Sequence, residues 1–207
     1  MRPEKFWDKV AVKSDIKFLT PDQIHVNTIN GVVKHLNNSD VILDFACGIG
    51  TKTIDIAGNF HSIRAIDTSS KMIEIANKRA TMENVSNVEF EEIDIFNNQL
   101  KTQSFDVILA LNILHLIEEP ELIIERIRAL LKPEGLFISA TACLGERWTP
   151  LTSCLLLLGK TKLIPNFNKF STSSLEGIIR DQGFEIVETD NISKALSERL
   201  IVARKIN

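Results

Sequence analysis

Short apolar runs alternate with amphipathic segments between residues 40 and 142, and this alternation restricts the possible folds more than any other feature of the sequence. Strands that are separated by helices must be joined by crossover connections, which make the strands parallel and place helices on both faces of one sheet. We therefore predict an α/β fold with a doubly wound, mostly parallel sheet. The expected strands cover residues 40–45, 62–66, 88–93, 105–111 and 136–142, and the expected helices cover 51–58, 69–83 and 121–131.

The segments on either side of this alternation complete one expected domain over residues 1–207. Residues 1–39 show two amphipathic helical patterns, with a helix start signal at Thr20-Pro21-Asp22. These helices either cover one edge of the core or form a lid, and both interpretations stay open. The rest of the chain is expected to form an apolar insertion, a helix and two strands, at 143–170, 171–182, 184–188 and 199–203.

Composition places the chain among ordinary globular proteins and disfavours several classes. The apolar share is 44%, the charged share is 25% and the net charge is −3, so no basic surface for nucleic acid is expected. The N-terminus is charged and has no apolar signal-peptide core, and the apolar run at 151–158 is far shorter than the roughly 20 residues of a membrane span. Three cysteines without a CxxC spacing and four scattered histidines favour a reducing cytoplasm and predict no disulfide framework and no metal site.

The stretch VILDFACGIGT, residues 41–51, is typical of a strand, a tight turn and a helix start, and it is the strongest candidate for a ligand site. Glycines let the backbone approach a ligand, and a helix N-terminus offers unpaired N–H groups. The dinucleotide fingerprint G-x-G-x-x-G would match Ala46, Gly48 and Thr51, so two of its three glycines are absent. Asp44 would also repel a pyrophosphate. The stretch therefore favours an adenosine ligand without phosphates, with a plain tight turn as the alternative.

Three acids fall at the carboxyl ends of successive expected strands, namely Asp44, Asp67 and Asp94. In doubly wound sheets, ligands bind outside these ends, near the point where the strand order reverses. Aspartate is also a common turn and capping residue, which gives a purely structural alternative. The repetition at three strand ends favours a polar ligand that lies across the strand tips.

Five motifs occur in the order and at the spacing of one known protein family, and a sixth segment follows them. They are VILDFACGIG, AIDTSSKMIEIANKRA, EEIDIF, FDVILALNILHLIEEP and LLKPEGLFISAT, followed by FSTSSLEGIIRDQGFEIVE. With these motifs the chain resembles the Rossmann-like S-adenosylmethionine-dependent methyltransferases over most of its length, from residue 40 to residue 205. The resemblance implies a seven-stranded sheet with the order 3-2-1-4-5-7-6, an antiparallel strand seven and S-adenosylmethionine as cofactor.

The resemblance also implies which residues bind this cofactor. Asp44 would lie near the methionine amino group, and Asp67 would bind the ribose hydroxyls. Asp94 with Ile95 would border the adenine, and Asn112 would stand beside the methionine part. The full set implied for the cofactor site is Asp44, Ala46, Gly48, Gly50, Asp67, Thr68, Met72, Asp94, Ile95 and Asn112.

Two departures from the family pattern concern the turn and the N-terminal segment. Gly48 and Gly50 would pass beneath the cofactor, whereas Ala46 replaces the first glycine of the family, a small change that should be tolerated. Many relatives carry an aromatic residue after the N-terminal Trp-Asp pair, and this chain has no tyrosine. The implied parts of the domain are a helical lid, a cofactor-binding half, an insertion that builds the acceptor pocket, and a last helix with two strands, at 1–39, 40–142, 143–170 and 171–207.

Methyl transfer from a sulfonium is an in-line displacement, so the protein mainly has to align the acceptor and exclude water. His115 is the candidate general base, although packing or turn capping is the preferred interpretation of this residue. The apolar insertion, which includes Trp148, predicts a small and partly apolar acceptor. The alternatives are a non-catalytic S-adenosylmethionine- or nucleotide-binding regulatory module and a methyltransferase that acts on protein or RNA. Thr51 in place of a glycine counts against an oxidoreductase that transfers hydride.

Overall fold

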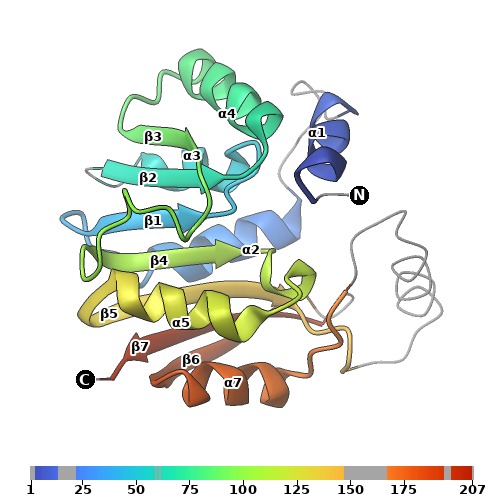
Figure 1. Cartoon of the computed structure of the whole chain (residues 1–207), viewed down its shortest axis with the longest axis vertical. Helices are drawn as coiled ribbons and strands as arrows, with labels where there is room; N and C mark the ends of the chain where they lie inside the picture. Colours follow the sequence, from blue (N-terminus) through green and yellow to red (C-terminus); the bar gives the residue numbers. More distant parts are fainter. Residues whose placement is uncertain are drawn as a thin grey trace.

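The computed structural model describes residues 3–13, 22–58, 60, 62–146, 167–193 and 197–206. The strands within them are β1 (Val41–Phe45), β2 (Ser62–Asp67), β3 (Val88–Glu92), β4 (Phe105–Leu111), β5 (Leu131–Ala142), β6 (Phe184–Ser193) and β7 (Glu198–Lys205). These strands form one sheet with the order β3-β2-β1-β4-β5-β7-β6 (Figure 1). Paired strands are parallel except that β7 runs antiparallel to β5 and β6. The predicted fold class and strand order are therefore confirmed.

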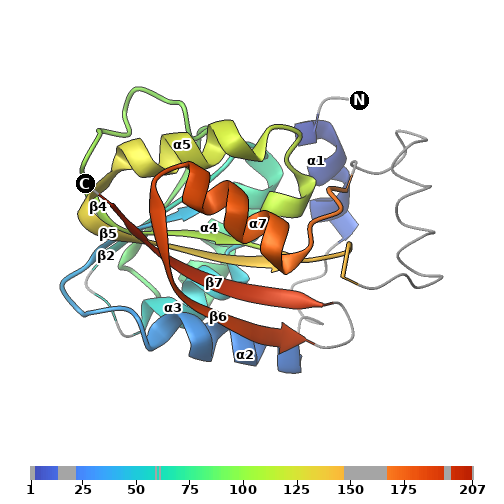
Figure 2. The ribbon, with the colours of Figure 1, turned by 90° about the horizontal axis from the view of Figure 1, so that it is seen from below.

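Helices cover both faces of this sheet. They are α1 (Pro3–Lys13), α2 (Gln23–Val33), α3 (Thr51–Ala57), α4 (Ser70–Met82), α5 (Pro120–Leu130) and α7 (Thr172–Asp181), with a 3-10 turn η2 (Leu114–Leu116). Figure 2 shows α5 and α7 on one face and α2 and α3 on the other. Helix α4 shares a core with α3, because Ile54 of α3 packs in the same cluster as Ile73 and Ala76 of α4. In the described part of the chain, no helix combines the length and the apolar character that a bilayer span requires.

The central strand β1 is held between two apolar cores. Its side chains alternate across the sheet, as in any strand. Leu43 packs into the core that includes Ile124 of α5, whereas Ile42 packs into the core that includes Val32 of α2. Both side chains are completely buried. The residues that follow at the carboxyl end of β1 are therefore carried on a rigid support.

Polar side chains cap the first turns of α2, α4 and α7. Ser69 accepts a hydrogen bond from the backbone N–H of Met72 and begins α4, and Ser171 forms a capping box that begins α7. Asp22, the last residue of the predicted start signal, accepts from the N–H of His25 at 2.8 Å and begins α2. These polar caps use donors that the first turn of a helix otherwise leaves without partners.

Strand β5 differs from its prediction, since it begins at Leu131 rather than at residue 136. Leu131 pairs with Phe105 and Leu136 pairs with Val107, and the register shifts between the two pairs. The segment between them, which contains Pro133, bulges out of the ladder because proline cannot donate a ladder hydrogen bond. The sequence does not reveal this short early pairing, because Leu131 continues the helical periodicity of α5 and the apolar run of the strand begins only after Gly135. Strands β6 and β7 are also longer than predicted, because they pair with each other.

The two N-terminal helices occupy different places. Helix α2 packs against α3 and β6, and the side-chain amide of Asn27 donates to the carbonyl of Ile192 at 3.1 Å. Helix α1 lies beside α4 near the carboxyl ends of β1 and β2 (Figure 1), where the Ser69 hydroxyl donates to Asp8 Oδ1 at 2.6 Å. The position of α2 agrees with the covering interpretation. Closure of α1 over a ligand stays a prediction.

Candidate functional site

The turn from β1 to α3 has an unusual backbone. Ala46, Gly48 and Gly50 have φ angles of +58°, +57° and +73°, in the left-handed region that favours glycine. Hydrogen bonds from Cys47 N to the Ile66 carbonyl (3.0 Å) and from Gly50 N to the Cys47 carbonyl (3.1 Å) hold the turn against β2. Ala46 adopts its positive φ without a glycine, an uncommon conformation for a residue with a side chain. The turn is therefore a built feature with a fixed geometry.

The two glycines of the turn are needed for different reasons. A Cβ atom built on Gly48 would meet no atom of the described protein within 4 Å, so this residue faces open space. A Cβ atom on Gly50 would lie 2.8 Å from the Phe90 ring and 3.1 Å from Ala76 Cβ. Gly50 therefore lets α3 approach β3 and α4, whereas Gly48 leaves a cradle in which a ligand can lie against the backbone.

A pocket of about 230 Å³ opens at this turn. It is lined by Asp44, Ala46, Cys47, Gly48, Ile49, Thr51, Lys52, Met72 and Leu111. Of the predicted site residues, the structure brings Asp44, Ala46, Gly48 and Met72 together in this lining. Sequence reasoning missed Lys52, the second residue of α3, which belongs to the lining of the pocket. Its adjacency to the glycine turn was the available signal.

Asp44 is the most buried acid of the pocket, with 2% of its surface exposed. Its Oδ2 accepts a hydrogen bond from the hydroxyl of Thr53 at 2.6 Å, whereas its Oδ1 is buried without a hydrogen-bond partner among the described residues. Burial raises the pKa of Asp44 to about 6, and the Thr53 hydroxyl and the Lys52 charge act against this rise. A buried carboxylate oxygen without a donor is a natural position for a cationic ligand group.

Asp67 connects the glycine turn to the start of α4. Its Oδ2 accepts from the N–H of Gly48 and its Oδ1 accepts from the N–H of Ser69, each at 2.9 Å. Burial raises the pKa of Asp67, while these two N–H groups act in the opposite direction. Each carboxylate oxygen keeps a further lone pair, so the oriented group is able to accept hydrogen bonds from two neighbouring hydroxyls. Thr68, the next residue, is exposed at the same strand end.

In the segment after β3, Asp94 and Phe96 are exposed and the side chain of Ile95 between them is buried, and the prediction that Asp94 and Ile95 border the adenine stays a prediction. Asp94 is exposed and its Oδ1 accepts from the N–H of Phe96 at 2.7 Å. The side chain of Ile95 is 1% exposed and lies in the core beneath α5, where its carbonyl accepts from Arg126 Nε at 3.0 Å. Phe96 is 52% exposed. The apolar surface at this strand end is therefore that of Phe96, whose direction depends on a turn that the sequence pattern does not define.

Asn112 follows β4 with a φ of +66°, and its N–H donates to the carbonyl of Ala140 at 2.7 Å. Its side-chain Nδ2 donates to Glu198 Oε1, and its Oδ1 is buried without a partner among the described residues. Glu198 is 2% exposed at the start of β7, and burial raises its pKa. Sequence reasoning missed Glu198 because nothing local connects it to a residue 86 positions earlier.

His115 is buried in η2, with 8% of its surface exposed. Its ring stacks on Phe167 at 5.9 Å between centroids and an interplanar angle of 16°. Burial lowers the pKa of His115 to about 4, so the imidazole is neutral at pH 7 and a weak proton acceptor. These contacts favour the packing interpretation, and a catalytic role for His115 stays a prediction. Trp148 and most of the predicted insertion, 147–166, lie outside the described residues.

Comparison with known proteins identifies the family. Residues 36–191 match the family model described as Methyltransferase domain, so the chain belongs to this methyltransferase family. It is 26% identical to an uncharacterized methyltransferase of Schizosaccharomyces pombe, over 93% of this chain and 75% of that protein. It is 24% identical to the ubiquinone biosynthesis O-methyltransferase of Neisseria meningitidis, over 67% of this chain and 57% of that protein.

A solved structure shows the same fold. Magnesium protoporphyrin IX methyltransferase from Synechocystis, crystallised with bound S-adenosylhomocysteine, superimposes with a TM-score of 0.72 and 21% identity, over 97% of this chain and 93% of that one. The present chain is an S-adenosylmethionine-dependent methyltransferase. Its own residues fit this cofactor, because the orphaned Oδ1 of Asp44 suits an ammonium group and the cradle at Gly48 suits a ligand held against the backbone.

Proposed function

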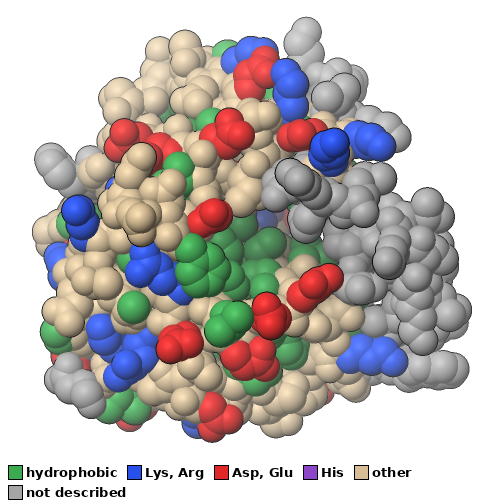
Figure 3. Space-filling view, in the orientation of Figure 1, with side chains coloured by type: hydrophobic (Ala, Val, Ile, Leu, Met, Phe, Trp, Pro, Cys, Tyr) green, Lys and Arg blue, Asp and Glu red, His purple; other side chains and the backbone are tan. Residues whose placement is uncertain are grey.

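We propose that the protein methylates a small, at least partly apolar molecule. The observation that carries this proposal is the character of the surface beside the end of β4. Figure 3 shows hydrophobic side chains gathered in a hollow of the face in view, with acidic side chains around it. An apolar hollow suits a small lipophilic acceptor, and an acidic rim repels a polyanion such as RNA.

Apolar residues of three elements support this assignment. Leu111 at the end of β4 and Met72 of α4 line the pocket at the turn. Phe96, after β3, is 52% exposed, and Leu122, on the first turn of α5, is 48% exposed. The Neisseria relative is named for ubiquinone biosynthesis, which agrees with a small acceptor. The net charge of −3 points the same way.

The chain's own residues have defined roles in this proposal. When bound, S-adenosylmethionine supplies a methyl group on a sulfonium. Asp44 accepts from the ammonium of the amino-acid part, Asp67 accepts from the ribose hydroxyls, and Asn112 lies beside the amino-acid part. Asp94 and the backbone near it border the adenine. Rate enhancement then comes from alignment of the acceptor and exclusion of water.

A general base is required only where the acceptor loses a proton. His115 is the candidate in the described residues after β4, and its low pKa limits its strength as a base. The division into a lid at 1–39, a cofactor-binding half at 40–142 and an acceptor insertion at 143–170 is part of the same proposal, as is a cytoplasmic location.

A methyl-transfer screen tests the proposal. Labelled S-adenosylmethionine is incubated with the protein and with lipophilic phenols, thiols, amines and quinone-like compounds, alongside tRNA and histone-like peptides. We expect turnover with members of the small-molecule set. Turnover confined to tRNA or peptides would contradict the proposal, and binding of the cofactor without any turnover would favour a regulatory module. Trp148→Ala should change which small acceptor is used while leaving S-adenosylhomocysteine affinity nearly unchanged.

A further inference from the structure

The orientation of the Asn112 amide is determined by chemistry. The oxygen and nitrogen of an asparagine side chain are ordinarily assigned from their hydrogen-bond partners. Glu198 Oε1 lies against one end of the Asn112 amide, and an ionised carboxylate is able only to accept hydrogen bonds. The end that faces Glu198 is therefore the NH₂ group, and the carbonyl oxygen Oδ1 points the other way.

This oxygen, which points away from Glu198, has no hydrogen-bond donor among the described residues. Asn112 Oδ1 is buried without a hydrogen-bond partner, and Asp44 Oδ1 is buried in the same condition. The two side chains come from the carboxyl ends of β4 and β1, which are paired neighbours in the sheet. The two acceptors without donors therefore lie at the same carboxyl-terminal edge of the sheet. A ligand that donates several hydrogen bonds would satisfy both.

Glu198 has no other evident purpose in the fold. It is 2% exposed, and no Lys, Arg or His of the described residues lies within ion-pair distance of it. Among the described residues, Asn112 is the hydrogen-bond partner of its side chain. Burial raises the pKa of Glu198 and of Asp44, and the charge of Lys52, a residue of the pocket lining, acts against this rise at both carboxyl groups. A buried carboxylate without a counter-ion is costly, so its retention calls for a role.

We propose that Glu198 is a positioning residue that fixes the Asn112 amide with its oxygen toward the amino-acid end of the cofactor. Asn112 Oδ1 and Asp44 Oδ1 then accept the ammonium group together, one from each strand. The proposal rests on the cofactor placement given under the proposed function. It assigns Glu198 a part in cofactor recognition although neither Glu198 nor Asn112 belongs to the lining of the pocket.

Isothermal titration calorimetry with two ligands tests this role. S-adenosylhomocysteine carries the amino-acid group, and 5′-methylthioadenosine lacks it while keeping the adenosine. Glu198→Gln is isosteric but brings an amide of its own, which lets the Asn112 amide turn over. Glu198→Leu removes the acceptor altogether. We expect either variant to weaken S-adenosylhomocysteine binding by at least about fivefold and to change methylthioadenosine binding by less than about twofold.

The effect must also pass through Asn112. In an Asn112→Ala background, Glu198→Gln should weaken S-adenosylhomocysteine binding by less than about twofold, since the group to be oriented is gone. Glu188→Gln is the matched control, because Glu188 is a half-buried carboxylate of β6 whose partners Lys34 and His35 lie in the turn that follows α2. We expect this control to leave both affinities unchanged.

Three results would overturn the positioning role alone, given a wild type that binds S-adenosylhomocysteine. They are unchanged binding in both Glu198 variants, equal losses for the two ligands, and full additivity with Asn112→Ala. A wild type that fails to bind S-adenosylhomocysteine would overturn the cofactor placement and the positioning role together. Circular dichroism of each variant shows whether a loss of binding comes from unfolding. If one Glu198 variant is unfolded, the other variant decides the test.

Discussion

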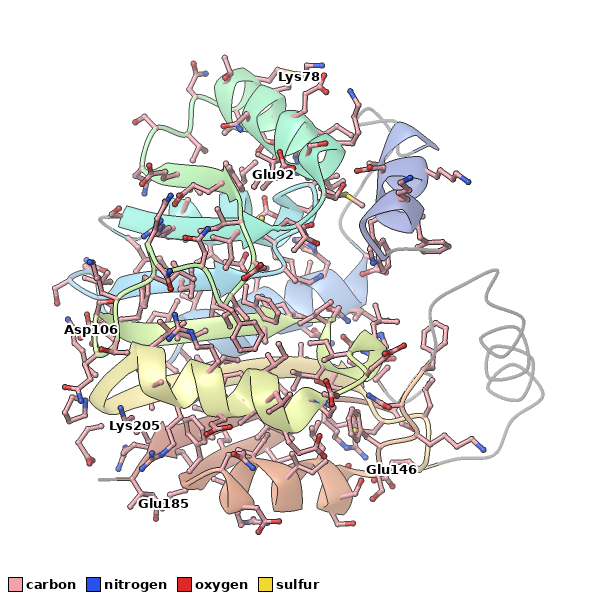
Figure 4. The ribbon with its side chains drawn as sticks, in the orientation of Figure 1. Lys78, Glu92, Asp106, Glu146, Glu185 and Lys205 are labelled. Carbon is pink, nitrogen blue, oxygen red and sulfur yellow. The ribbon has the colours of Figure 1, made fainter. Side chains whose placement is uncertain are left out.

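The polar groups at the two ends of the sheet differ in whether they have hydrogen-bond partners within the protein. At the amino end of β4, Asp106 accepts from the N–H of Val41 and from the ammonium of Lys132, each at 2.8 Å. Lys205 donates to the carbonyl of Leu131 at 2.7 Å. Figure 4 shows Asp106 and Lys205 on the side of the sheet that lies away from the carboxyl ends of β1 and β4. This end is held together by its own pairs.

At the carboxyl end, several buried polar atoms have no partner within the described residues. Asp44 Oδ1, Asn112 Oδ1 and Thr141 Oγ1 are of this kind. Arg128 is an exception, because it lies away from the carboxyl end and its Nε also lacks a partner among the described residues. Its Nη2 donates to the Ile206 carbonyl at 3.1 Å. Buried polar atoms that lack partners reduce stability, and their concentration at this end supports the proposal that a ligand binds there.

The largest expected effect is that of Gly48→Val at the carboxyl end. A branched side chain would fill the cradle, so binding of S-adenosylhomocysteine should be abolished in calorimetric titration. Because the new Cβ would meet no atom of the described residues within 4 Å beyond its chain neighbours, the cost to stability should be limited to about 1 to 2 kcal/mol of backbone strain.

Gly50→Ala is the matched control for Gly48→Val. Here the new Cβ would lie 2.8 Å from the Phe90 ring, so thermal unfolding should show a larger loss of stability than at Gly48. A folded Gly48→Val variant that binds with wild-type affinity would place the ligand elsewhere.

In the wild type, lowering the pH should raise stability and weaken cofactor binding through Asp44. Asp44→Asn should remove both of these trends. The folded-state pKa of Asp44 is raised to about 6, above its unfolded value, so the folded protein takes up a proton as the pH falls from 6 to 4. This uptake stabilises the ligand-free wild type by on the order of 2 kcal/mol across that window, and the gain is lost as the pH rises through 6. Affinity for S-adenosylhomocysteine should move the other way, because the protonated acid no longer attracts an ammonium group.

Denaturant unfolding and calorimetry between pH 7 and pH 4.5 measure both trends. The Asn variant should lack the rise in stability that is assigned to Asp44 and should show a flatter affinity profile. Parallel pH profiles for the two proteins would contradict the assignment of this pKa to Asp44.

Asp67→Ala should weaken S-adenosylhomocysteine binding at least about tenfold, since hydrogen bonds to a charged group contribute roughly 1.5 to 3 kcal/mol each. The variant also loses the acceptors for Gly48 N and Ser69 N, so circular dichroism must accompany the titration. Affinity equal to that of the wild type would show that the ribose does not lie at Asp67.

Asp106→Asn should have the smallest effect, and it should lower stability without changing cofactor binding. Burial raises the pKa of Asp106, but Lys132 and the Val41 N–H outweigh this and hold it below its usual value. The substitution should therefore lower the free energy of unfolding by about 1 kcal/mol in urea, with no change in cofactor affinity. A loss of affinity without a loss of stability would erase the contrast between the two ends.

Much of the fold and part of the site follow from local sequence signals. The strand β4 was predicted at its observed bounds, and the start of α2 was predicted from the signal that ends at Asp22, because period and capping are local properties. The turn at Ala46 and Gly48 was predicted from its small residues and the acid before it.

Other features depend on contacts between distant segments. The different roles of Gly48 and Gly50 become visible only when Phe90 and Ala76 are in place. The burial of Ile95 depends on its packing against α5. Glu198 joins Asn112 only after β7 has been inserted between β5 and β6. Such residues are selected by three-dimensional proximity, which a pattern of apolar and polar residues does not encode.

The central claim is that the carboxyl end of the sheet binds the cofactor and the amino end only supports it. Amide hydrogen exchange of the wild-type protein, with and without saturating S-adenosylhomocysteine, tests this claim most directly. We predict increased protection at residues 44–51, 67–72 and 111–112, and none at 101–106 or 131–135. Protection confined to the amino end, or spread evenly over the sheet, would contradict it.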